Sequence, residues 1–255
     1  MNIRILGCSG GIGAGLRTTA IRVDEDILID TGTGVGDLTL DEMRAIRHVF
    51  MTHSHLDHAV GLPLLLDTVF EARSSDPLLV HGRVETLDAL RKHIFNWVLW
   101  PDFSVLPSPE AAVMRFQEMQ VGGSIELGGR RLTAVDVNHT VPGLAYIVEG
   151  NGKVFAFSGD TGPNRTLWQA LNELPRLDVL VVETAFANRN LQLANESRHY
   201  CPDTLAADLG TLRHDPDIWL THLKPGAEDE ILGEVRAALP GRRLQRLVGG
   251  ETFTL

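Results

Sequence analysis

The chain has 255 residues, of which 44% are hydrophobic and 22% are charged, and its formal net charge is −10. This is the composition of an ordinary globular protein that is long enough to bury a substantial core. Because binding of nucleic acid draws on a basic surface, the acidic balance argues against a protein whose main partner is nucleic acid.

Cysteine content and terminal sequence predict the compartment. The two cysteines, Cys8 and Cys201, are too few for a disulfide framework and favour the reducing cytoplasm. The N-terminal residues lack a basic region followed by an apolar core, so no signal peptide is expected. Apolar stretches stay well short of the roughly 18–20 residues of a membrane-spanning helix, so no membrane partner is expected either.

The first half of the chain alternates short apolar runs with turns and amphipathic segments. The glycine-rich turn 7–13 has no clear helix after it, so it predicts a hairpin or rim loop rather than a nucleotide-binding loop. Strands are predicted at residues 2–6, 18–23, 27–30, 48–52 and 78–82, and helices at 41–46, 61–72 and 83–93.

Residues 96–109 are rich in Trp, Phe and Pro without a clear period, which predicts a long loop beside a pocket. Trp97, Trp100 and Phe103 in this loop could stack on a nucleotide base, but packing in the core or in a lid is the favoured interpretation. Whether these three side chains line a pocket is left open by the sequence.

The second half returns to alternating strands and helices, with no internal repeat or linker. Strands are predicted at residues 114–119, 131–137, 144–148, 154–157, 177–182, 218–220 and 244–248, and helices at 167–174, 204–213 and 228–239. The whole pattern predicts a single α/β domain over residues 1–255, in which helices pack on the outer faces of two β-rich sheets in four layers.

The most informative segment is residues 52–58, Thr-His-Ser-His-Leu-Asp-His, directly after a predicted strand. Three imidazoles and a carboxylate at this density are costly in a structural loop, and they suit Zn, Mn or Fe rather than Ca or Mg. His53 and His55 lie two residues apart and can face one side of an extended segment. Asp57 and His58 follow where the chain has begun to turn. One short loop could therefore serve two adjacent metal ions.

Polar residues also stand at four other predicted strand ends, where ligands collect in layered α/β proteins. Packing requirements alone would hardly explain polar residues at so many strand ends. They are His139, Asp160, Glu183 and His222.

The order of these residues resembles the metallo-β-lactamase superfamily: a His-x-His-x-Asp-His motif, a later His, an Asp after Ser-Gly, and a His toward the C-terminal end. The resemblance implies a four-layer αββα sandwich of two mixed sheets and two divalent metal ions, with Zn first and Mn or Fe as alternatives. It implies that one ion is held by His53, His55 and His139, the second by Asp57, His58 and His222, and that Asp160 bridges both.

Within that superfamily the chain resembles class II cyclic-nucleotide phosphodiesterases. Gly-Leu-Pro follows the His motif at 61–63, Ser-Arg-His-Tyr-Cys-Pro stands at 197–202 and Thr-His-Leu-Lys-Pro at 221–225. That family has a Ser-Gly-His-Leu-x-Pro-like and a His-Ile-Lys-Pro-like stretch at the last two places. The first of these fits well at His199 and Pro202 and loosely elsewhere, which puts the substrate in question rather than the chemistry.

The mechanism expected for such a site is attack of a metal-held hydroxide on phosphorus. Asp57 would orient the hydroxide, and His199, held by Glu183, would protonate the departing sugar oxygen. Lys224 and His199 would contact the substrate phosphate. Plainer roles remain open for three of these: an exposed loop residue for His199, a turn partner for Glu183 and a solvated cation for Lys224. His48, His81, His93 and His214 fit no ordered motif and are expected to be structural.

The predicted function is hydrolysis of a small phosphodiester, a 3′,5′-cyclic nucleotide and first of all cyclic AMP, to a nucleoside monophosphate. One alternative is a tRNA 3′-end endonuclease, but only 20 residues separate His139 from Asp160, which leaves no room for a long tRNA-gripping insertion. Hydrolysis of an ester, lactone or thioester is a second alternative. A regulatory binding module is a third, and the complete ligand set argues against it. A homodimer is left open.

Overall fold

The computed structural model describes residues 1–73 and 76–255, which form two seven-stranded sheets. We call them the N-terminal and the C-terminal sheet. The N-terminal sheet runs, in spatial order, β14 (Thr252–Thr254), β1 (Asn2–Gly7), β2 (Ala20–Val23), β3 (Ile27–Ile29), β4 (His48–Phe50), β5 (Leu78–Gly82) and β6 (Met114–Glu118). The C-terminal sheet runs β13 (Leu244–Arg246), β12 (Asp217–Thr221), β11 (Val179–Glu183), β10 (Lys153–Phe157), β9 (Gly143–Gly150), β8 (Arg130–Val137) and β7 (Ser124–Leu127).

Both sheets are mixed in the same way. In the N-terminal sheet the strands from β14 to β3 pair antiparallel and those from β3 to β6 pair parallel. In the C-terminal sheet the strands from β7 to β10 pair antiparallel and those from β10 to β13 pair parallel. The carboxyl ends of parallel strands meet at one edge of a sheet, which is where ligand sites form in α/β proteins.

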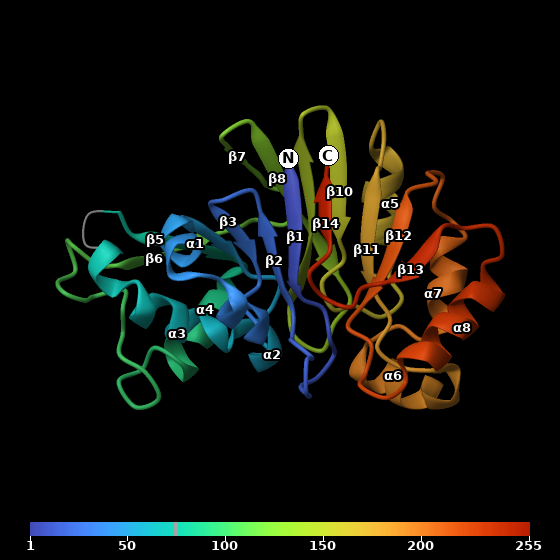
Figure 1. The fold of residues 1–255 in the computed structure, drawn as a ribbon, viewed down its shortest axis with the longest axis horizontal. Coiled ribbons are helices and arrows are strands. Elements are labelled where there is room, and N and C mark those ends of the chain that lie inside the picture. Colours follow the sequence, from blue (N-terminus) through green and yellow to red (C-terminus); the bar gives the residue numbers. More distant parts are fainter. Residues whose placement is uncertain (74–75) are drawn as a thin grey trace.

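Helices cover the outer face of each sheet, so that the layers run helix, sheet, sheet, helix (Figure 1). The N-terminal side carries η1 (Thr33–Asp37), α1 (Leu40–Ala45), α2 (Leu56–Ala59), α3 (Gly61–Thr68), η2 (Phe70–Arg73) and α4 (Val84–His93). The C-terminal side carries α5 (Thr166–Glu173), η3 (Asn188–Asn190), α6 (Leu191–Ser197), α7 (Pro202–Leu209) and α8 (Glu228–Ala238). The four-layer α/β prediction is confirmed.

The layers follow from strands that are apolar on both faces. In β11, Val179 and Val181 pack between the two sheets, whereas Leu180 and Val182 pack against the outer helices. Phe50 of β4 likewise points into the space between the sheets. Because side chains alternate along a strand, a continuous apolar run is what a sheet covered on both faces requires.

In the described residues the structure adds six elements that the sequence pattern did not predict: η1, α2, η3, α6, β7 and β14. β14 is short, and it forms because Phe253 pairs with Ile3 at the other end of the chain. Residues 96–109 contain neither helix nor strand, in agreement with the predicted loop. Within the described residues, no helix is both long enough and apolar enough to cross a membrane.

Candidate metal centre

The loop after β4 presents the His-x-His-x-Asp-His motif in two conformations. The chain leaves β4 at Phe50, bends at Thr52 and reaches His55, the extended N-cap of α2, before it turns into that single-turn helix. His53 and His55 therefore project from the segment before the helix, while Asp57 and His58 project from a helical turn. Close packing fixes the loop, because a Cβ atom on Gly32 would lie 2.4 Å from the Asp57 carbonyl oxygen.

The remaining candidate ligands follow three strand ends of the C-terminal sheet. His139 comes after β8, Asp160 after β10 and His222 after β12. His222 has a φ of 62°, a left-handed conformation that non-glycine residues rarely adopt. Its backbone N–H donates to the Cys8 carbonyl oxygen at 2.7 Å, a bond to the end of β1 that helps to hold this conformation.

These side chains form two groups of four that share Asp160. In each group, one potential ligand atom per residue lies within 4.8 Å of the others. The first group is His53, His55, His139 and Asp160, and the second is Asp57, His58, Asp160 and His222. These are the two sets that the sequence resemblance implied.

The two oxygens of Asp160 face different groups. Oδ2 lies 3.7 Å from His53 Nε2, in the first group. Oδ1 lies 3.3 Å from His58 Nε2 and 3.3 Å from His222 Nδ1, in the second group. A carboxylate in this position can bind one cation with each oxygen.

The donor atoms fit divalent transition-metal ions. In the described part of the chain, His53 Nε2, His58 Nε2 and His222 Nδ1 are buried and have no hydrogen-bond partner. A buried polar atom in that state costs about 1–3 kcal/mol, which coordination would offset. His139 Nε2 and His55 Nδ1 lie 3.1 Å apart. This is close to the ~3.3 Å edge of a tetrahedral site with metal–nitrogen bonds of about 2.0–2.1 Å.

Neighbouring groups orient three of the imidazoles, and for His53 the group is the Thr52 hydroxyl, 3.0 Å from Nδ1. His58 Nδ1 donates to Oδ2 of Asp30 at 2.7 Å, and His139 Nδ1 donates to the Arg198 carbonyl oxygen at 3.1 Å. Each bond leaves the Nε2 lone pair for a metal. Asp30 is fully buried and also accepts from the backbone N–H and the hydroxyl of Thr52, both at 2.7 Å. The sequence analysis did not single out Asp30, Thr52 or Arg198 for the site.

The electrostatics favour neutral His53, His139 and His222 beside an ionised carboxylate, whereas Asp160 and Asp30 raise the pKa of His58 against the effect of burial. Burial lowers the pKa of His139 to about 4 and that of His222 to about 3, and it also lowers the pKa of His53. Against the effect of burial, His222 and His58 hold the pKa of Asp160 well below its usual range. Neutral nitrogens and an anionic oxygen are the forms that bind a metal.

Glu183 and His199 form a buried pair beside both groups. Glu183 is fully buried, and its Oε1 accepts from His199 Nδ1 at 2.7 Å. The His199 ring lies 4.9 Å from the His139 ring and 5.3 Å from the His222 ring, measured between centroids. Burial raises the pKa of Glu183, and Glu183 in turn raises the pKa of His199 against the opposing effect of burial. His199 Nε2 is the ring nitrogen not engaged by Glu183.

Arg198 joins the loop before His199 to His139. It caps the C-terminus of α6 in a left-handed conformation with a φ of 53°. Its carbonyl oxygen accepts from the His139 ring, and its Nη1 donates back to the His139 carbonyl oxygen at 2.7 Å. The family pattern has Gly at this position, where the left-handed conformation is free of strain.

Lys224 lies near His199 but is engaged elsewhere. Its Nζ donates to the Gly10 carbonyl oxygen at 2.8 Å and stands 5.7 Å from the centre of the Phe186 ring. The Phe186 ring in turn packs edge-on against His199. An ammonium group is thus available close to the site.

The aromatic side chains of the 96–109 loop divide between core and surface. Phe103 is 3% exposed and packs in the core under the helices of the N-terminal sheet, with Trp100 against the same core. Trp97 is 62% exposed. Packing therefore accounts for two of the three, and the structure gives no contact between Trp97 and the candidate ligands among the residues it describes.

The four remaining histidines lie outside both groups. His48 Nδ1 and His81 Nε2 are 3.0 Å apart, and the His81 ring stacks on Phe50 with centroids 4.4 Å apart. His93 ends α4. Neither His93 nor His214 belongs to a metal-binding group within residues 1–73 and 76–255.

Comparison with known proteins agrees with this geometry. Residues 25–222 match the beta-lactamase superfamily domain. The chain is similar to a probable 3′,5′-cyclic-nucleotide phosphodiesterase of Yersinia pestis, with 28% identity over 160 residues. That alignment covers 57% of this chain but only 45% of the relative.

Two longer alignments extend over most of both proteins. A 3′,5′-cyclic-nucleotide phosphodiesterase of Aliivibrio fischeri is 23% identical over 86% of this chain and 80% of its own. A ribonuclease Z of Bradyrhizobium diazoefficiens is 25% identical over 86% and 87%. Among solved structures, unliganded yeast PDE1 superposes with a TM-score of 0.83 at 20% identity, over 100% of this chain and 99% of that one. Human tRNase Z, short form, has a TM-score of 0.71 at 18% identity over 100% and 99%.

Proposed function

The chain belongs to the beta-lactamase superfamily and is a hydrolase of the metallo-β-lactamase fold, and on this premise we propose that it is a phosphodiesterase that opens 3′,5′-cyclic nucleotides, first of all cyclic AMP, to nucleoside monophosphates. The observation that carries the proposal is the Glu183–His199 pair beside two metal-binding groups that share Asp160. Such a site offers a place for an activated water, positive charge for a phosphoryl group and an acid for an alkoxide leaving group.

We infer that the two groups hold two divalent ions within a single hydrolase domain. The histidine-rich donor set favours Zn, with Mn or Fe as alternatives. When bound, such ions lower the pKa of a water molecule and neutralise charge on phosphoryl oxygens. The proposed ligands are His53, His55 and His139 for one ion, Asp57, His58 and His222 for the other, and Asp160 for both.

The roles proposed for the side chains follow from their positions. The Asp57 side chain is 33% exposed, so that it can accept a hydrogen bond from the attacking water and orient it toward phosphorus. As the new phosphorus–oxygen bond forms, the bond from phosphorus to O3′ breaks. The proton that the water loses passes to the Asp57 carboxylate, and His199 delivers the proton on Nε2 to O3′. Glu183 stabilises the protonated ring and fixes its orientation. Lys224 supplies a cation near the phosphate.

Two features favour a small substrate over tRNA. The relatives include both cyclic-nucleotide phosphodiesterases and ribonucleases Z, so kinship alone leaves both open. In this chain, however, β9 and β10 fill most of the interval between His139 and Asp160, and β9 pairs directly with β10. The net charge of −10 also opposes an extended contact with RNA.

We place the enzyme in the cytoplasm.

The test is a substrate panel with purified protein loaded with Zn or Mn. It contains cyclic AMP, cyclic GMP, bis(p-nitrophenyl) phosphate, a precursor tRNA and a lactone, and product formation is followed by chromatography. Turnover of a cyclic nucleotide well above the other compounds supports the proposal. Cleavage of the precursor tRNA without cyclic-nucleotide turnover would assign the chain to the tRNA-processing class, and turnover of the lactone alone would exclude phosphodiester chemistry.

Variants separate the metal ligands from the acid. Asp57→Ala and His199→Ala are both expected to abolish turnover, but only Asp57→Ala should weaken metal retention, measured by elemental analysis. His93→Ala, which changes an exposed histidine at the end of α4, is the matched control and should retain both properties. Equal metal loss in the Asp57 and His199 variants would make His199 a ligand rather than an acid.

A further inference from the structure

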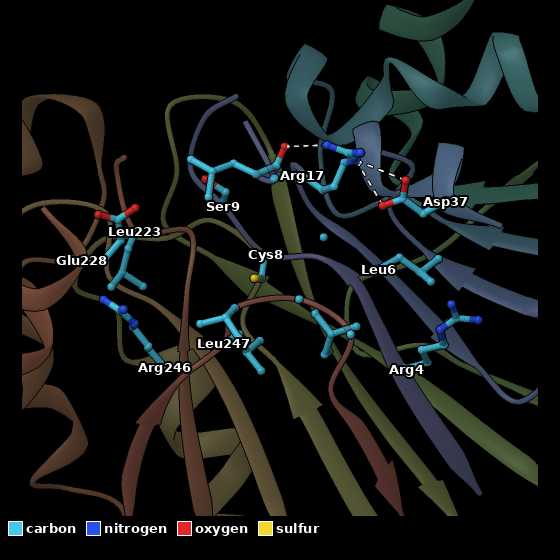
Figure 2. A pocket seen from close by; sticks show the side chains of 17 residues that line it. Arg4, Leu6, Cys8, Ser9, Arg17, Asp37, Leu223, Glu228, Arg246 and Leu247 are labelled. Atoms are coloured by element: carbon cyan, nitrogen blue, oxygen red, sulfur yellow. Dashed lines mark hydrogen bonds and ion pairs between the residues drawn. The ribbon is translucent and has the colours of Figure 1, made fainter. Parts of the chain in front are cut away.

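A hollow lies between the end of β1 and the segment that follows β13, outside the two groups of candidate metal ligands. Its volume is about 380 Å³, and none of the candidate metal ligands lines it. This is within the range of about 300–1,000 Å³ of sites that bind small molecules. Figure 2 shows Arg4, Arg17 and Arg246 on three sides of Cys8 and Leu247, which lie toward the centre of the view.

The inner wall of the hollow is apolar. Leu6, Cys8, Leu223 and Leu247 line it, and each is at least nine-tenths buried in the fold. Burial, and the carboxylate of Glu251, raise the pKa of the Cys8 thiol to about 12. The thiol is therefore protonated at neutral pH and acts as an apolar wall, not as a nucleophile.

One polar group in this wall lacks a partner. Ser9 is 8% exposed and lines the hollow, and its hydroxyl has no hydrogen-bond partner among the described residues. A buried hydroxyl in that state costs about 1–3 kcal/mol. The hydroxyl oxygen is closed off from solvent, so a bound molecule would reach it only with a small movement of the wall.

Unused hydrogen-bond donors around the opening suit an anion. Three arginines line the hollow, and each is in an ion pair: Arg4 with Glu42, Arg17 with Asp37 and Arg246 with Asp229. The case for an anion therefore rests on their unused N–H donors and not on an excess of positive charge. Each guanidinium has five N–H donors, and Arg4 and Arg246 each use only Nη1, on Glu42 and Asp229. The other N–H groups of these two guanidiniums make no hydrogen bond within residues 1–73 and 76–255, and they suit a carboxylate, sulfonate or phosphate.

We propose that this hollow is a binding site for a small anionic molecule with an aromatic or aliphatic body, and that its occupancy is coupled to the metal centre. The coupling would run through the wall that both sites share. The Cys8 carbonyl oxygen accepts from the His222 backbone N–H at 2.7 Å and from the Thr221 hydroxyl at 3.1 Å, and Gly10 N–H donates to the Leu223 carbonyl oxygen at 3.0 Å. His222 is held in a left-handed conformation, which costs energy, so a small shift of this wall changes the position of a candidate ligand.

The probe for the site is 8-anilinonaphthalene-1-sulfonate, which joins an aromatic body to one anionic group. We expect saturable binding to the Zn-loaded protein, followed by fluorescence, and binding at least tenfold weaker for N-phenyl-1-naphthylamine, the same body without the sulfonate. Absence of saturable binding overturns the proposal. Equal affinity for both probes overturns the anionic assignment.

Substitutions locate the binding event. Val248 is 67% exposed and lines the hollow, so Val248→Trp adds bulk there without disturbing the core and should abolish one equivalent of probe binding. Val84→Trp, at an exposed position of α4 outside the hollow, is the matched control and should bind as the wild type does. Arg246→Gln should weaken binding about three- to tenfold, whereas Arg243→Gln, directly before β13 and outside the hollow, should not. Unchanged binding in both the Val248 and the Arg246 variants would place the probe elsewhere and overturn the proposal.

The coupling has its own readout, which requires no substrate. Because linkage is reciprocal, the probe should bind the Zn-loaded and the chelator-treated protein with dissociation constants that differ by about fivefold or more, and it should change the Zn affinity by the same factor. Identical constants in the two states overturn the coupling and leave the binding site standing.

Discussion

The two sheets contribute to the metal centre in different ways. The N-terminal sheet supplies four side chains within six residues, from the single loop after β4. The C-terminal sheet supplies one side chain from each of three strand ends, after β8, β10 and β12. The first half of the site is therefore set by local backbone geometry. The second half exists only when three strands are in register, so its integrity depends on the packing of the whole sheet.

Asp160 is the residue on which the two halves converge, so its loss should have the largest effect. Its oxygens face His53 on one side and His58 on the other, and Asp160→Asn removes the negative charge shared by both groups. We expect retention of both metal ions to fall and turnover to drop on the order of 10³-fold or more. Elemental analysis and the rate with bis(p-nitrophenyl) phosphate measure the two effects.

The control for this variant is Asp136→Asn, which removes a half-exposed carboxylate of β8 in the same sheet. It should leave metal content and turnover unchanged. The one expected cost is a small loss of stability, because the ion pair with Arg83 is removed. Two tightly held ions in the Asp160 variant would show that the halves do not depend on a common carboxylate.

Asp30 tests the local half alone. It accepts from the His58 ring and from two groups of Thr52, and an asparagine cannot accept all three bonds. Asp30→Asn should lower metal affinity 10- to 100-fold, by the usual magnitude for a group that orients a ligand. The loss should be larger for the ion next to His58, which Asp30 contacts directly, than for the ion next to His53, whose Nδ1 lies 3.0 Å from the Thr52 hydroxyl that donates to Asp30. Chelator competition resolves the two ions. Equal weakening of both would show that the loop is not an independent unit.

The same contrast explains how much of the site could be predicted. The motif at 52–58 is contiguous, so the sequence alone shows its candidate ligands. His139, Asp160 and His222 are dispersed, and they were found because polar residues stood at predicted strand ends in the order of a known family. The fold class followed from apolar periodicity, whereas β14 was missed because its pairing with β1 joins the two ends of the chain.

The roles of Asp30 and Arg198 could not be predicted from the sequence, for a physical reason. The role of Asp30 depends on the parallel register of β3 and β4, in which Ile29 pairs with Phe50, and no local pattern encodes that register. A signal was nevertheless present, since Asp30 also stands at a strand end beside the motif strand. Arg198 departs from a Gly in the family pattern, and only its left-handed φ shows why Gly would be usual there. Such contacts become visible when the sheets are assembled.

Arg198 tests the dispersed half with a smaller effect. Arg198→Gly and Arg198→Ala both remove the guanidinium contact to the His139 carbonyl oxygen, but only Gly relieves the left-handed backbone. We expect both to lose about three- to tenfold in turnover, and the Gly variant to be about 1 kcal/mol more stable than the Ala variant in denaturant unfolding. Wild-type turnover in both variants would mean that the side chain does not position His139.

The histidines of the N-terminal sheet that lie outside the site should affect stability and not catalysis. Burial, together with His48, lowers the pKa of His81 to about 4. Because this folded-state value lies below the unfolded value, the contribution of His81 to stability is complete above about pH 6.5 and is lost as the pH falls toward 4. His81→Phe keeps an aromatic ring against Phe50 and cannot be protonated.

The unfolding free energy of the wild type should therefore fall between pH 7 and pH 4.5 by about 1–2 kcal/mol more than that of the His81→Phe variant, measured in urea. The candidate ligands His139 and His222 also have lowered pKa values, so the wild type and the variant share the rest of the acid sensitivity. Turnover at neutral pH should be the same in both. Parallel stability curves would show that the pKa of His81 is the same in the folded and unfolded states. A loss of turnover would extend the site to a histidine that the geometry leaves outside it.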